Sequence, residues 1–290
     1  MATRGQFVLS LAGQVVGPLQ AAAGGDLSAE VFRGASGDAF YTSKHLGPVR
    51  YEPFSLQIDL SMAKPVYDWI AASWGPNLIR KAGQVLALDA QGHIRQSRDF
   101  FGALITELTI PALDTSSRDA VALTVTFQPD LIAHRWAPGG GLLAPEPRPR
   151  ASWLASNFRL EIDGLDCTHV NLVESFVLRR EPPRDPSGDP RNAAVPLDFP
   201  DLVVTLPEAS GATWIAWHED FLVGGNNDDT REKSGRLHFL APDMAHELGR
   251  IDLFHLGIVR LSSDTSKGDG VARLRAEMYC ERMEFSAPGV

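Results

Sequence analysis

The chain repeats its own sequence pattern, and this repeat limits the folds open to it. Residues 6–15 read QFVLSLAGQV, and residues 157–166 read NFRLEIDGLD. In both segments apolar residues alternate with other residues up to a glycine, which predicts a half-buried strand that leads into a turn. Aligned without a gap, the apolar residues of the two segments are Phe7, Leu9 and Leu11, and Phe158, Leu160 and Ile162.

The repeat continues in the same order along the chain. One later pair of segments shares an alternating apolar strand followed by Trp-Ile-Ala, with Trp69 and Ile70 in the first copy and Trp214 and Ile215 in the second. Four matching pairs in one order indicate a tandem duplication. The three later pairs are residues 53–74 with 200–217, 105–114 with 255–264, and 122–127 with 273–278.

The duplication predicts a mainly-β chain of two tandem domains, each a β-sandwich or barrel with a flanking helix. We expect the first domain at residues 1–133 and the second at residues 154–290. Residues 134–153 are rich in proline and glycine, which is typical of an extended linker. A second proline-rich tract, residues 181–200, is an insertion in the second domain. It replaces residues 30–53 of the first copy, so both are interpreted as long excursions between strands.

Length and composition agree with two soluble domains. The 290 residues are 44% hydrophobic and 22% charged, enough for two cores of about 130 residues each. No apolar run approaches the roughly 20 residues of a membrane span. The first residues alternate like a strand and lack the continuous apolar core of a signal peptide. We therefore expect a cytoplasmic origin and no membrane insertion.

Charge and cysteine content further limit the class of protein to which the chain can belong. Basic and acidic residues balance in residues 1–150, so residues 151–290 carry the whole net charge of −9. Phosphate binding depends on clustered cations, so a specific nucleic-acid-binding surface is not expected. Cys167 and Cys280 both lie in the second half. Two buried thiols are favoured over a disulfide, which stays the alternative.

Residues 63–74 predict a helix. Val66, Trp69, Ile70 and Ser73 recur at helical spacing, and Pro65 falls near the first turn, where its missing N–H costs little. The apolar stripe is interpreted as the face that packs on a sheet. A ligand groove is the alternative interpretation.

A search for catalytic and metal-binding motifs finds none, so no catalytic, cofactor or metal residue is assigned. His218, Glu219 and Asp220 are adjacent, so their side chains point in different directions and indicate a solvated helix end. His246 and His255 have no partner at metal-ligand spacing. The run of Asn226, Asn227, Asp228 and Asp229 lacks the spacing of a calcium loop and predicts a polar turn.

Three longer segments resemble a known protein family. They are MAKPVYDWIAASW (62–74), ITELTIPALDTSSRDAVALTVTFQPD (105–130) and SNFRLEIDGLDCTHVNLVESFVLRR (156–180). They resemble tail-tube-like proteins of contractile phage tails and related bacterial contractile injection systems. The resemblance implies a domain of two packed sheets with one flanking helix, whose copies join edge to edge into a ring around a channel. The family normally has one such domain per chain.

The resemblance implies a non-enzymatic structural ring component: a tube protein, a tube adaptor or initiator, a terminator, or a hub-like protein. We expect three chains to supply six domains in one ring with pseudo-sixfold symmetry, with a ring of six chains as the rival. Expected partners are other tube, baseplate or cap proteins. Assembly is expected in the cytoplasm, before incorporation into a phage-tail-like particle.

Two other classes stay open. A β-sandwich module that binds carbohydrate or peptide would expose aromatic side chains on one face, for which Trp136, Trp153 and Trp217 are candidates. A hydrolytic enzyme with an unrecognised site would bring His218 or the region of Asp228 beside a second titratable cluster.

Overall fold

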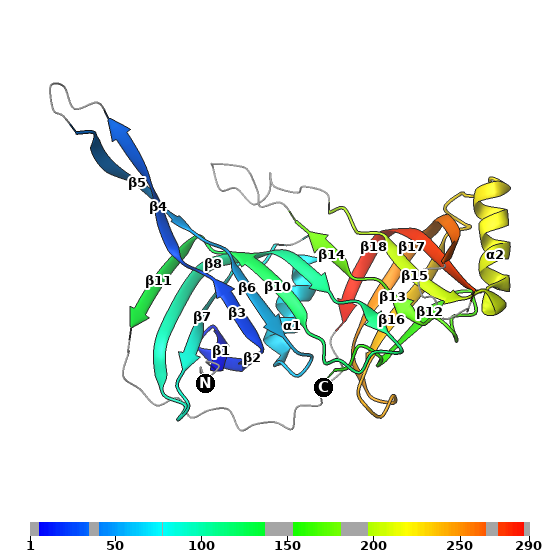
Figure 1. The fold of residues 1–290 in the computed structure, drawn as a ribbon, viewed down its shortest axis with the longest axis horizontal. Coiled ribbons are helices and arrows are strands. Elements are labelled where there is room, and N and C mark those ends of the chain that lie inside the picture. Colours follow the sequence, from blue (N-terminus) through cyan, green and yellow to red (C-terminus); the bar gives the residue numbers. More distant parts are fainter. Residues whose placement is uncertain are drawn as a thin grey trace.

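The fold is built almost entirely from antiparallel strands. The computed structural model describes residues 6–34, 41–76, 78–136, 153–180, 197–264 and 272–286. These residues form two large sheets, a separate two-stranded hairpin and a few helices (Figure 1). The expectation of a mainly-β chain is confirmed.

The first sheet has the strand order β2-β1-β7-β8-β10-β6-β3. The long strand β8 bends through the sheet, and β11 and β14 also pair with it. The strands are β1 (Gln6–Leu11), β2 (Gln14–Leu19), β3 (Ala21–Gly24), β6 (Phe54–Ile58), β7 (Lys81–Leu88), β8 (Ile94–Ile110), β10 (Leu123–Gln128), β11 (Leu131–Trp136) and β14 (Phe176–Arg179).

The second sheet has the strand order β12-β16-β17-β18-β15-β13-β9. Its two longest strands, β17 and β18, form the middle of the sheet. The strands are β9 (Leu113–Asp114), β12 (Phe158–Ile162), β13 (Leu172–Val173), β15 (Leu202–Pro207), β16 (Lys233–Leu240), β17 (Glu247–Asp264) and β18 (Arg273–Ser286).

The two sheets follow the same order of strands. The run β1-β7-β8-β10-β6-β3 corresponds to β12-β16-β17-β18-β15-β13. Even an irregularity recurs, because the pairing of β8 with β10 skips Thr106 and the pairing of β17 with β18 skips Val259. A skipped residue is a β-bulge, which bends the strand and increases its twist. In this register residues 107–110 of β8 correspond to residues 260–263 of β17.

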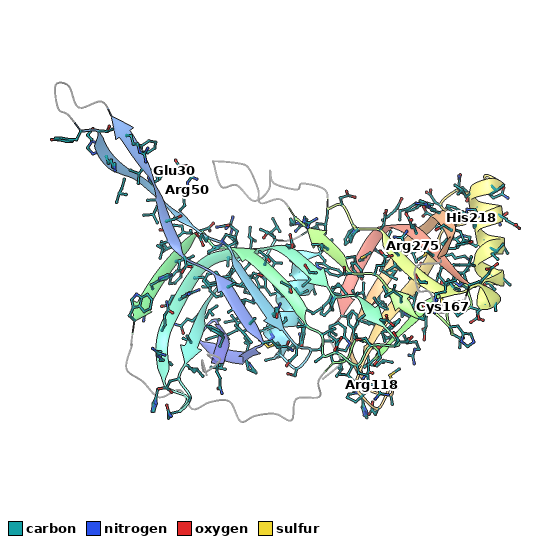
Figure 2. All side chains as sticks on the ribbon, viewed as in Figure 1. Glu30, Arg50, Arg118, Cys167, His218 and Arg275 are labelled. Atoms are coloured by element: carbon teal, nitrogen blue, oxygen red, sulfur yellow. The ribbon has the colours of Figure 1, made fainter. Side chains whose placement is uncertain are left out.

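The excursion between strands in the first half is a β-hairpin arm. β4 (Leu27–Gly34) and β5 (Ser43–Tyr51) pair only with each other among the described strands, and the arm extends away from both sheets (Figure 1). Glu30 and Arg50 form an ion pair across it (Figure 2). Gly24 and Gly25 both have positive φ angles, 75° and 72°, where the chain leaves β3 for the arm. Glycine adopts this left-handed conformation without steric cost.

One helix covers each sheet. α1 (Lys64–Ser73) buries the predicted stripe of Val66, Trp69, Ile70 and Ser73, which agrees with the core interpretation. In the second half a 3₁₀ turn η2 (Glu208–Ser210), α2 (Ala212–His218) and a π-helical turn η3 (Glu219–Val223) follow one another.

Buried apolar side chains from both halves form one continuous cluster. Of the residues expected in the core, Leu9, Leu11, Trp69, Ile70, Phe158, Leu160, Ile162 and Trp214 are buried. Phe7 and Ile215 are half-buried and pack against the cluster.

The segment between the two halves is not a simple linker at its ends. β11 extends to Trp136, and Trp153 is buried against Phe239 with ring centroids 4.8 Å apart. The ends of the expected connector are thus part of the folded structure, because strand pairing and aromatic packing reach into it. Residues 137–152, and residues 181–196 of the expected insertion, lie outside the described residues. The division into two domains stays a prediction.

Leu160 tests whether the inward face of β12 is assigned correctly. We expect Leu160→Ala to lower the free energy of unfolding by about 2–5 kcal/mol, because a buried leucine is truncated. Leu131→Ala is the matched control, since Leu131 lies in a strand but is 46% exposed, and its cost should stay below about 0.5 kcal/mol. Denaturant titration measures both, and equal losses would contradict the assignment.

Candidate functional site

A strand from the second half completes the edge of the first sheet. β14 runs antiparallel to the end of β8, and Arg179 lies opposite Glu107. The Arg179 Nε donates a hydrogen bond to the Glu107 Oε2 at 3.0 Å, and the Arg180 backbone amide donates to the Thr106 carbonyl at 2.8 Å. The two halves are therefore joined by strand pairing, and we call this contact the internal joint.

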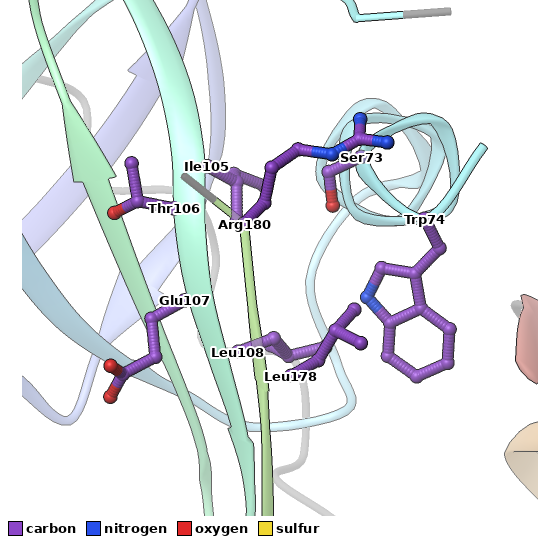
Figure 3. A pocket seen from close by; sticks show the side chains of 8 residues that line it. All are labelled: Ser73, Trp74, Ile105, Thr106, Glu107, Leu108, Leu178 and Arg180. Atoms are coloured by element: carbon purple, nitrogen blue, oxygen red, sulfur yellow. The ribbon is translucent and has the colours of Figure 1, made fainter. Parts of the chain in front are cut away.

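The internal joint is closed by apolar packing against α1. Leu178 of β14 and Leu108 of β8 lie opposite each other, and both are buried beside Trp74 at the end of α1 (Figure 3). The Arg180 Nη2 donates a hydrogen bond to the Gly75 carbonyl at 3.0 Å, and burial lowers the pKa of this guanidinium. The pocket there has room for little more than a water molecule. It is a packing interface and has no room for a substrate.

The helix α1 also contacts the second sheet. The ring of Phe285 on β18 lies 6.1 Å from that of Tyr67 and 5.9 Å from that of Trp74, between centroids. Trp69, on the same helix, stacks on Phe100 of the first sheet at 6.5 Å. One helix therefore packs against both halves.

A short strand of the first half in turn joins the second sheet. β9, which follows β8, pairs with β13 and forms the edge of the second sheet. The backbone amide of Thr115 donates to the Asn171 carbonyl at 3.0 Å, and that of Val121 donates to the Trp153 carbonyl at 2.9 Å. Each half thus supplies an edge strand to the sheet of the other.

Two strand edges that correspond to the paired edges of the internal joint lack a strand partner among the described residues. The outer edge of β4 has none, and β17 pairs with β16 only up to Leu256, so that edge is open over the rest of the strand. Exposed apolar side chains accompany both edges. We define the arm-side surface as Leu27, Val31, Phe32 and Trp136, and the helix-side surface as Leu222, Val223 and Val259.

The two surfaces lie at opposite ends of the molecule. The arm and β11 are at one end, and α2 is at the other (Figure 1). Within the first end, the His134 Nε2 lies 2.8 Å from the Gly25 carbonyl oxygen, which ties β11 to the base of the arm. The chain thus has one internal joint between two open ends.

Comparison with known proteins identifies the first half. Residues 3–130 match the family model of the T4-like virus tail tube protein gp19. Residues 3–130 belong to the tail tube family. The tail tube domain includes β1 to β10, the arm and α1, so the resemblance seen in the sequence is confirmed for this part of the chain.

Three solved structures of contractile systems are similar to part of this chain. The cap that terminates the anti-feeding prophage tube is 21% identical, with a TM-score of 0.39, over 45% of this chain and 88% of that chain. The sheath-tube complex of the PVC extracellular contractile injection system is 19% identical, with a TM-score of 0.38, over 45% and 88%. The anti-feeding prophage baseplate is 13% identical, with a TM-score of 0.40, over 48% and 98%.

No curated protein sequence matches the chain. Among the described residues, no helix is long and apolar enough to cross a membrane.

Among the described residues outside the tail tube domain, the polar groups do not converge on a reaction centre. Glu219 and Asp220 are exposed at the start of η3, after His218 at the end of α2. Asn226 Nδ2 donates to Asp220 Oδ1 at 2.6 Å, and the Thr230 backbone amide donates to Asp228 Oδ1 at 2.9 Å. These contacts belong to a polar turn, as the sequence predicts.

His255 has partners that sequence spacing did not reveal. It lies in β17 with a positive φ of 57°, and its Nδ1 is 2.8 Å from the Glu232 Oε2. Glu281 is close enough to share an ion with them. Tyr279 donates to the other Glu232 oxygen at 2.6 Å, and burial followed by this hydrogen bond raises the Tyr279 pKa. Both carboxylate oxygens of Glu232 therefore have hydrogen-bond partners within the chain.

The three candidate tryptophans do not form one binding face. Trp153 and Trp217 are buried, whereas Trp136 is 73% exposed at the end of β11. The lysine amine of Lys233 lies 5.4 Å from the ring centroid of Trp217, which is therefore covered from that side. An aromatic platform for carbohydrate or peptide is not supported by this arrangement.

Both cysteines are free thiols. Cys280 is buried, and its Sγ lies 3.2 Å from the Arg282 carbonyl oxygen. Cys167 is half-buried. Burial raises the pKa of each thiol to about 11, so both are almost entirely protonated near neutral pH and are poor nucleophiles.

Proposed function

We propose that the chain is a non-enzymatic ring component of a contractile, phage-tail-like injection system. The observation that carries the proposal is a tail tube domain joined, by exchanged edge strands, to a second sheet of the same strand order. Such a chain supplies two neighbouring sectors of a ring. The described polar residues bring no nucleophile and base together beside a cavity, which supports a structural role.

The open ends of the molecule support ring closure. An unpaired strand edge is a template for another strand, and pairing between subunits removes it. Because the two open ends differ, copies join head to tail, and such contacts either close into a ring or continue as a filament. Three chains would supply six tube-like units with pseudo-sixfold symmetry. The rival is a ring of six chains with the second unit stacked along the axis or outside the tube.

The difference between the halves supports a position at a junction of the particle. The first half is electrically balanced, whereas residues 151–290 carry the net charge of −9. A repeating tube would place identical units in every sector, but this ring would alternate two kinds of sector. We therefore propose an adaptor, initiator, terminator or hub-like ring, with tube, baseplate or cap proteins as partners. Assembly in the cytoplasm precedes incorporation into the particle.

Native mass spectrometry and particle imaging test the ring. The expected species has three times the chain mass of 31.5 kDa, and imaging should show the two halves alternating in one layer. A mass of six chains, with six copies of the first half in one layer, would contradict the three-chain ring and favour the rival. A strictly monomeric chain at concentrations well above micromolar would contradict the ring itself.

A further inference from the structure

We propose that the internal joint is repeated between copies of the chain: the base of the β4 arm in one copy pairs with the open edge of β17 in the next. The partner is thus a second copy of this chain, bound through named strands in a stated register. The inference rests on the proposed ring function and specifies its contact.

The register follows from the correspondence between the two sheets. Ala21 of β3 lies opposite Gln57 of β6, and Leu172 of β13 lies opposite Thr205 of β15. Gln57 and Thr205 occupy equivalent positions in the two sheets, so Ala21 corresponds to Leu172. Counting on from these positions, Leu27 corresponds to Leu178, and Ser28 corresponds to Arg179.

The acceptor strand is aligned in the same way by its bulge. Leu108 and Glu107 of β8 correspond to Leu261 and Arg260 of β17. At the internal joint, β14 places Leu178 opposite Leu108 and Arg179 opposite Glu107. Between copies the same pairing places Leu27 opposite Leu261 and Ser28 opposite Arg260.

The exposed side chains at both edges show that this contact is absent from the single chain. Leu178 is 5% exposed at the internal joint, but Leu27 is 42% exposed. Val259, in the bulge beside the acceptor residues, is 43% exposed. Strand addition would bury these apolar side chains and pair the free backbone groups of both edges.

A second contact follows from the same correspondence. On β18, Phe285 lies opposite Ile251 of β17. On β11, His134 lies opposite Arg98 of β8. Arg98 is the residue of β8 that corresponds to Ile251 of β17. The end of β11 therefore corresponds to the end of β18, which packs against α1 through Phe285. Between copies, the end of β11 should meet the helices of the second half.

Both sides of this second contact are apolar and exposed. Trp136 at the end of β11 is 73% exposed, and Leu222 and Val223 at the end of η3 are 45% and 72% exposed. The turn η3 contacts β17, the strand that carries the open edge. One arm-side surface therefore faces one helix-side surface, with two independent contacts in a single interface.

Disulfide trapping tests the strand register in the full chain. Residues opposite each other on antiparallel strands have Cα atoms about 4.5–5.5 Å apart, within the roughly 4.4–6.8 Å that a disulfide spans. We expect an equal mixture of the single variants Ser28→Cys and Arg260→Cys to form a covalent dimer under mild oxidation. Non-reducing electrophoresis and mass spectrometry of the linked peptides detect it.

Two matched controls accompany the mixture. The double variant Glu107→Cys with Arg179→Cys probes the equivalent pair inside one chain, where it should form an intramolecular disulfide. A mixture of Ser28→Cys with Thr230→Cys places the second thiol at another exposed site of the same half, and no dimer should form. Equal linkage at both sites would indicate random collision and would overturn the proposal.

The outcomes separate this inference from the ring function. Rings that form without the link between residues 28 and 260 would overturn the strand pairing and leave the structural assignment intact. A chain with neither link nor self-association would overturn both.

Trp136→Ala tests the second contact independently. Because Trp136 is exposed in the single chain, its truncation should leave the unfolding temperature nearly unchanged. Loss of a central interface tryptophan typically weakens association by about 30-fold or more. Analytical ultracentrifugation measures the self-association constant. Unchanged self-association of the Trp136→Ala chain would overturn the contact between β11 and the helix-side surface.

Discussion

Replacing Phe100 with alanine is expected to lower the free energy of unfolding by about 3–5 kcal/mol. Phe100 is fully buried and lies at the centre of an aromatic cluster, with ring centroids 4.8 Å from Phe127, 5.6 Å from Phe54 and 6.5 Å from Trp69. Truncation leaves a cavity that the three neighbouring rings and the strands cannot fill, because the interior is densely packed. Guanidinium titration of the full chain gives the loss.

Phe101 supplies the control one residue away. It lies on the opposite face of β8 and is 43% exposed, since successive side chains of a strand point to opposite faces. Phe101→Ala should cost less than about 1 kcal/mol. A loss for Phe101→Ala equal to that for Phe100→Ala would show that the two faces of β8 are assigned wrongly.

Replacing Leu178 with aspartate is expected to open the internal joint. The side chain is buried beside Leu108 and Trp74, and an unpaired charge in such a site costs several kcal/mol. β14 should therefore leave β8, and the two halves should unfold in separate steps. Calorimetry would then resolve two transitions, and limited proteolysis would cut first near residues 172–180.

The neighbouring residue again provides the control. Val177 lies opposite Thr109, is half-buried and belongs to the other face of β14. Val177→Asp should disturb the joint much less than Leu178→Asp. A single, unshifted transition for Leu178→Asp would contradict the view that strand pairing holds the halves together.

The parts of the fold that depend on local sequence could be predicted. Alternating apolar residues around Leu9 and Leu160 identify the inward faces of both first strands, and the spacing of Val66, Trp69 and Ile70 identifies α1. These patterns arise from the geometry of one element and its burial, so neighbouring residues contain them. The sequence repeat then indicates which strands of the two halves correspond.

The interaction site depends on contacts between distant residues and could not be predicted in this way. Residues 176–179 alternate like any strand, and nothing nearby shows that they pair with residues 107–110 of the other half. The same holds for His255, whose partners Glu232 and Glu281 lie on other segments. Register across a sheet is set by packing and partner choice, which local propensity does not contain.

The exchange of edge strands also orders events during synthesis. The acceptor edge of β8 ends at residue 110, but its partner β14 ends at residue 179. At about 5–20 residues per second, this edge waits roughly 4–14 s for its partner to be made. During that interval two nascent chains on neighbouring ribosomes expose the same acceptor, so a partner strand from the wrong chain competes with the right one. We therefore expect closely spaced ribosomes to favour pairing of β14 with the β8 edge of another chain.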